Sequence, residues 1–64
     1  MAEYFHLSGP LMGVNTDKKV MIIMVEGNER TFNYQVELPE EWIAKNVGEE
    51  ITVVIKDGVI IRVK

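Results

Sequence analysis

Turn-forming residues recur so closely along this chain that only short elements fit between them. They fall at Gly9-Pro10, Asn15-Thr16-Asp17, Gly27-Asn28, Pro39, Gly48 and Asp57-Gly58. The runs between these points are rich in Val, Ile, Met, Phe and Tyr, residue types that favour strands. With 64 residues, 47% of them hydrophobic, and no linker or repeat, the sequence predicts one all-β domain over residues 1–64, interrupted once.

The run from Arg30 to Leu38 has the clearest period. Its apolar side chains occupy every second position: Phe32, Tyr34, Val36 and Leu38. This alternation is typical of a strand with one buried face. Pro39 ends the strand, and the acidic residues that follow favour the start of a helix of about two turns that stops at Gly48. We expect Trp42 on this helix to be largely buried, so that the helix plugs one end of a barrel.

The first two strands are less regular. The second, Lys19 to Glu26, is apolar on both faces, and its alternation does not decide which face is buried. One face carries Val20, Ile22 and Met24, and the other carries Met21, Ile23 and Val25. The first strand, Tyr4 to Val14, is broken at Gly9-Pro10. We expect Gly9 or Gly13 to supply the bend that lets one strand serve two sides of a barrel.

The last hairpin can turn through two residues, Asp57-Gly58, or through three, Lys56-Asp57-Gly58. The two-residue loop places the cations of the last strand among the aliphatic side chains of the strand before it. The three-residue loop shifts the register by one residue and unites the aliphatic side chains of Ile51, Val53, Ile55, Val59, Ile61 and Val63 on one face. This register predicts a positive φ at Gly58 and places Val54 and Ile60 on the exterior.

The order of three strands, a short helix and two strands resembles the oligonucleotide/oligosaccharide-binding (OB) barrel. The resemblance covers nearly the whole chain and lies in GPLMGV, TFNYQV, and VGEEITVVIKDG before VIIRVK. It implies a small five-stranded barrel with one short helix (β-β-β-α-β-β) and specifies no ligand. Small periplasmic copper-carrier barrels end in a similar hairpin. Their metal-binding His, Trp and two Met are not matched here in spacing, so we expect no metal.

The segment VELPEEWIAKNVGEEITVVIKDGVIIRV also resembles the AbrB-type swapped-hairpin DNA-binding regulators. That resemblance implies an intertwined dimer with a basic surface that faces DNA. The present chain departs from the pattern, because its net charge is −3 and its first eighteen residues have no counterpart. An AbrB-like dimer is the alternative fold, and a nucleic-acid-binding module is the alternative function.

The sequence contains no constellation typical of catalysis. It has one histidine, His6, and no cysteine, so we predict no catalytic or cofactor-binding residues and no enzymatic activity. Phe32 and Tyr34 have the spacing of a base-stacking platform, but we interpret them as core. Ten acidic residues against seven basic ones argue against a nucleic-acid partner. No apolar run is long enough to span a membrane, and the lack of cysteine fits a cytoplasmic location.

The sequence has more large apolar side chains than the core of a small barrel can bury, and this excess suggests a function. Whichever face of the second strand is buried, the opposite face leaves three large apolar side chains outside, and a small monomer rarely exposes such a patch without a use. We therefore expect a non-catalytic protein-interaction or self-associating module, with a protein partner or a second copy of the chain. The candidate contact surface consists of Met21, Ile23, Val25, Val54 and Ile60.

Overall fold

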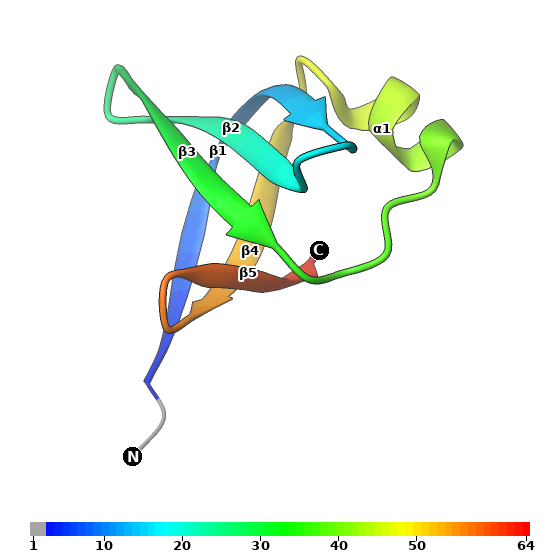
Figure 1. Ribbon diagram of the computed structural model, residues 1–64. Coiled ribbons are helices and arrows are strands. Elements are labelled where there is room, and N and C mark those ends of the chain that lie inside the picture. Colours follow the sequence, from blue (N-terminus) through cyan, green and yellow to red (C-terminus); the bar gives the residue numbers. More distant parts are fainter. Residues whose placement is uncertain (1–2) are drawn as a thin grey trace.

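The computed structural model describes residues 3–64, and within that range it contains five strands and one helix (Figure 1). The elements are β1 (Tyr4–Asn15), β2 (Val20–Val25), β3 (Asn28–Tyr34), α1 (Glu40–Asn46), β4 (Glu50–Lys56) and β5 (Val59–Val63). The predicted β-rich order, with a short helix between the third and fourth strands, is confirmed.

The strands close into a ring in the order β1-β2-β3-β5-β4, with β4 returning to β1. Neighbouring strands are antiparallel except for β3 and β5, which run parallel. One chain supplies all five strands of this ring, whereas the AbrB-like alternative implies strands contributed by two subunits.

β1 is long because it serves two sides of the ring. Its first part, Tyr4–Pro10, pairs with β4, and from Leu11 onward it pairs with β2. The change of partner occurs beside Gly9, where a β-carbon would overlap the carbonyl oxygen of Met24. Gly13 has no such contact. Gly9 therefore lies at the close approach to β2, whereas the irregularity in the pairing of β1 with β2 lies between Leu11 and Gly13.

Side chains from every strand of the ring fill its interior: Leu11, Met21, Ile23, Tyr34, Ile51, Val53, Ile55 and Ile60. On β2, Met21 and Ile23 have no exposed surface, and Val25 packs against the same core. The alternation left the buried face of this strand undecided, and the candidate contact surface, which includes these three residues, required them to face outward; the structure places them inward. They point inward because they share a face with Leu11 and Val14, their inward-facing partners on β1. The outer face of β2 carries the other set of side chains.

The last hairpin turns through two residues rather than three. Lys56 pairs directly with Val59, and both Asp57 and Gly58 have positive φ, 52° and 79°. Two successive residues with positive φ are what a type I′ hairpin turn requires. The predicted positive φ at Gly58 is confirmed, and the predicted three-residue loop is wrong.

A bulge beyond this turn shifts the register by one residue, in the opposite direction to the shift expected from the longer loop. Ile55 pairs with Ile60, but Val54 pairs with Arg62, so Ile61 is an extra residue in β5. Because the two-residue turn sets Ile60 opposite the buried Ile55, Ile60 points into the core, where none of its surface is exposed. The bulge then keeps Arg62 beside Val54 on the outer face. The prediction that Ile60 lies on the exterior is therefore wrong.

β3 ends at Tyr34, earlier than the predicted end at Leu38. Its pairing with β5 stops at Tyr34–Ile60, and after one more hydrogen bond, from the Gln35 N–H to the Ile60 carbonyl (2.9 Å), the chain leaves the sheet. The alternation predicted from the sequence nevertheless holds, because Val36 and Leu38 still pack against the core.

α1 contacts the core through part of its surface. None of its residues is fully buried, but Trp42 is partly buried and packs against the core, as expected for the residue that anchors this helix. The helix carries two acidic residues in its first turn, as expected. Beyond its end, Gly48 adopts a φ of 92° and donates its N–H to the Leu11 carbonyl (2.7 Å), which ties the connection to β1.

Replacing Gly9 with alanine is expected to lower the free energy of unfolding by about 1–3 kcal/mol, because the added methyl group must displace the backbone at Met24. Chemical denaturation of both proteins measures the change. Gly13→Ala is the matched control, since a β-carbon at that position would meet no atom within 4 Å. Equal stabilities for the two variants would show that the close approach at Gly9 is not required.

Truncating Ile60 to alanine is expected to cost about 2–5 kcal/mol of unfolding free energy, and Ile60→Lys is expected to unfold the domain, because the side chain is completely buried. Circular dichroism and urea titration report both effects. Met12, which is exposed on β1, provides the control, and Met12→Lys should remain folded. A stable, cooperative Ile60→Lys variant would contradict the observed register.

Candidate interaction surface

Large exposed apolar side chains occur at four positions among residues 3–64: Tyr4, Phe5, Met12 and Val47. Two of these are adjacent. Tyr4 and Phe5 begin β1 and are 55% and 60% exposed. They make the first half of β1 the most prominent apolar feature on the described surface.

The segment Tyr4–Ser8 is hydrogen-bonded into the sheet along one edge only. β4 pairs with it from Tyr4–Lys56 to Ser8–Thr52, and the hydroxyl oxygens of the last pair lie 2.8 Å apart. The pairing of β1 with β2 begins only at Leu11, and no residue of 3–64 supplies a backbone partner for the second edge. In Figure 1 this half of β1 runs beside β4 and out toward the N-terminus. Its second edge therefore presents unpaired backbone N–H and carbonyl groups.

The outward-facing side chains of this segment surround Val54. Val54 pairs with His6 on one side and Arg62 on the other, and a depression of about 500 Å³ is lined by Tyr4, His6, Val54, Ile61, Arg62 and Lys64. Val54 thus lies on the outer face, as predicted, but only 8% of its surface is exposed because its neighbours cover it. Nearby, the Lys56 amino group lies 5.6 Å from the centroid of the Tyr4 ring.

The alternate side chains of the segment continue the inner face of the sheet. Leu7 pairs with Val53 and packs against the core, whereas Phe5 pairs with Ile55 near the end of β4. Phe5 therefore projects beyond most of the core and remains mainly exposed.

The edge of Tyr4–Ser8 differs from the other unpaired edges of the sheet because it lacks charged residues. The start of β3, before its pairing with β5, carries Glu29 and Arg30, and the end of β5, after its pairing with β3, carries Arg62. Charged side chains on edge strands discourage the addition of another strand. The segment Tyr4–Ser8 contains no Asp, Glu, Lys or Arg and has no such protection.

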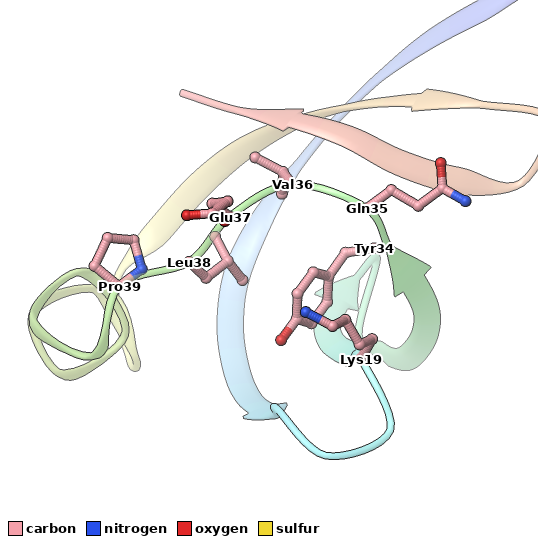
Figure 2. A pocket seen from close by; sticks show the side chains of 7 residues that line it. All are labelled: Lys19, Tyr34, Gln35, Val36, Glu37, Leu38 and Pro39. Atoms are coloured by element: carbon pink, nitrogen blue, oxygen red, sulfur yellow. The ribbon is translucent and has the colours of Figure 1, made fainter.

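A second hollow lies beside the extended segment that follows β3 (Figure 2). This open groove has a volume of about 630 Å³ and is lined by Lys19, Tyr34, Gln35, Val36, Glu37, Leu38 and Pro39. Figure 2 shows Lys19 beside the Tyr34 ring, and its amino group lies 5.8 Å from the ring centroid. The Tyr34 N–H also donates to the Lys19 carbonyl (3.1 Å). Because Tyr34 is only 4% exposed, the groove offers little of its aromatic surface to a ligand.

The aromatic residues of β3 belong to the core, as interpreted from the sequence. Tyr34 is buried, and Phe32 packs against the core with the Arg30 guanidinium carbon 5.7 Å from its ring centroid. Neither ring is arranged as an open stacking platform.

The residues predicted to form the contact surface do not form one open patch. Met21, Ile23 and Ile60 are fully buried, Val54 is covered, and Val25 packs against the core. Tyr4 and Phe5 were missed. The sequence does show an uncharged, aromatic start to the first strand. Whether the edge of that strand is free depends on where its pairing with β2 stops, which the sequence does not show.

The described part of the chain contains no group of three or more His, Cys, Asp or Glu residues placed to hold a metal ion. Nor do residues 3–64 include a helix with the length and apolar character needed to cross a membrane.

Phe5→Lys is expected to change the free energy of unfolding by less than about 1 kcal/mol, because Phe5 is mainly exposed. Leu7→Lys is the matched comparison on the same face and should cost more than about 2 kcal/mol, since Leu7 packs against the core. Urea denaturation distinguishes the two variants. A severe loss of stability in Phe5→Lys would show that Phe5 contributes to the core.

Comparison of the chain with protein-family models, curated proteins and solved structures finds no match.

Proposed function

We propose that this protein is a non-catalytic interaction module that binds a protein partner along the unpaired edge of β1. The observation that carries the proposal is the combination, in Tyr4–Ser8, of a free backbone edge, exposed aromatic side chains and no charged residue. An extended segment of a partner can join such an edge as a further strand.

The two faces of this edge suggest how a partner would be recognised. Backbone hydrogen bonds supply affinity in strand addition, and side chains at alternate positions supply specificity. On the inner face, Phe5 offers apolar contact beside Leu7. On the outer face, the depression next to Tyr4 and His6 can receive a side chain of the added strand. We therefore infer a partner segment that is extended and carries apolar side chains at alternate positions.

The OB-like interpretation is part of this proposal. The ring order and the parallel pairing of β3 with β5 support it, as does the helix between β3 and β4. OB barrels that bind oligonucleotides use the face of strands 2 and 3 and the adjoining loops. Here the outer face of β2 presents apolar side chains. Together with the net charge of −3, this face favours a protein partner over a nucleic acid.

Selection of extended peptides from a displayed library against the wild-type protein tests the proposal. Peptides with alternating apolar residues are expected, and their affinity should fall at least tenfold for Phe5→Lys, because that side chain lies at the proposed contact. Met12→Lys is the matched control, since it introduces the same charge at an exposed apolar position outside Tyr4–Ser8 and should bind as the wild type does.

Selected peptides that bind Phe5→Lys and the wild type equally well would place the contact elsewhere. Salt-sensitive binding of DNA or RNA at micromolar concentration would instead support the nucleic-acid alternative.

A further inference from the structure

We propose that the partner of the unpaired β1 edge is the same edge of a second copy, joined in antiparallel fashion about a two-fold axis. This inference rests on the proposed function and narrows it to one partner. The resulting contact would extend the sheet from β4 through β1 of one copy into β1 and β4 of the other.

The charge pattern of the edge suits pairing with itself. In an antiparallel self-pairing, each side chain lies opposite or near another from the same short segment, so charges on the segment would be brought close together and partly desolvated. Tyr4–Ser8 has no Asp, Glu, Lys or Arg. The unpaired stretches of β3 and β5, which carry Glu29, Arg30 and Arg62, lack this property.

Symmetry and the surrounding structure select the register. A two-fold axis perpendicular to the sheet requires one residue to lie opposite its own copy. Centring the pair on His6 places Phe5 opposite Leu7 twice, which gives two apolar cross-strand contacts. Centring it on Phe5 would set Glu3 opposite Leu7, a charge against an apolar side chain.

A centre at Leu7 is disfavoured for a different reason. It would extend the new pairing to Pro10, which has no backbone N–H to donate. It would also bring the second copy alongside Gly9, where the backbone of Met24 already lies. The register centred on His6 ends at Ser8 and avoids both obstacles.

The size of the contact predicts a weak dimer. An aromatic side chain buries about 150–250 Å² when fully covered, so Tyr4 and Phe5, at 55% and 60% exposed, offer roughly 400 Å² from both copies together. Stable interfaces bury about 1,200–2,000 Å². We therefore expect a monomer at about 10 μM and substantial dimer as the concentration approaches about 1 mM.

Sedimentation equilibrium across this concentration range tests the dimer. The average mass should rise from that of one 7.3 kDa chain toward twice that value. Phe5→Lys and, as a second variant, Tyr4→Lys should weaken association at least tenfold, while Met12→Lys should associate as the wild type does. Circular dichroism establishes that each variant is folded. A wild-type protein that remains monomeric at about 1 mM overturns the inference, as does a dimer unaffected by both β1 variants.

A single introduced cysteine tests the register. The chain has no cysteine, so a thiol placed at one position can form a disulfide only with the same position of another copy. Residues directly opposite in an antiparallel pair have α-carbons about 4.5–5.5 Å apart, which suits a disulfide. His6→Cys should therefore cross-link at least tenfold faster than Met12→Cys. Equal rates would overturn the proposed pairing.

The two proposals can fail separately. Peptide binding is measured at about 10 μM, where the protein is expected to be monomeric. A protein that binds peptides through Phe5 but stays monomeric at high concentration retains the proposed function and loses the self-pairing. Loss of Phe5-dependent peptide binding would remove the proposed function even if a dimer formed through another surface.

Discussion

The close approach of Gly9 to the backbone of Met24 is the constraint on which the ring depends. It occurs where β1 leaves the side of β4 and begins to pair with β2. β1 joins β2 and β3 to β4 and β5 on one side of the ring. On the other side the two pairs of strands meet where β3 runs parallel to β5, and within residues 3–64 that pairing contains only the pairs at Asn33 and Tyr34. β1 therefore provides the more extensive connection, and a side chain at Gly9 would separate its two partners.

The same change of partner creates the candidate interaction surface. A strand that pairs with one neighbour in its first half and another in its second half has a free edge in each half. In the second half, the loop before β4 covers part of that edge, because Leu11 exchanges hydrogen bonds with Gly48 and Glu49. In the first half, no described residue does this for Tyr4–Ser8. The fold thus protects one free edge of β1 and leaves the other exposed.

The sequence predicts the local features of this fold better than the pairings between distant segments. The order of elements, the buried side of β3 and the importance of a glycine in β1 follow from turn residues and a period of two. The inner face of β2 could not be chosen, because both sets of its side chains are apolar. The last register was also ambiguous, since a three-residue loop and a two-residue turn followed by a bulge shift the pairing by one residue in opposite directions, and both place Val53 and Val63 on one face.

The candidate surface was missed for a related physical reason. Hydrophobicity alone directed attention to Met21, Ile23 and Ile60, which the ring buries. A free strand edge is defined instead by where a neighbouring strand stops, and here that depends on the register between β1 and β2, segments joined by a turn but matched over only part of their length.

The difference between an apolar face and a free strand edge also explains why the edge of Tyr4–Ser8 is favoured over the apolar outer face of β2. The side chains of Val20, Ile22 and Met24 are half-buried, and the backbone of β2 is paired with β3 along its whole length. A partner on that face would gain apolar contact alone. A partner on the edge of Tyr4–Ser8 would gain apolar contact and directional backbone hydrogen bonds together, which also fix its orientation and register. The free backbone edge therefore makes Tyr4–Ser8 a more specific candidate site than the apolar outer face of β2.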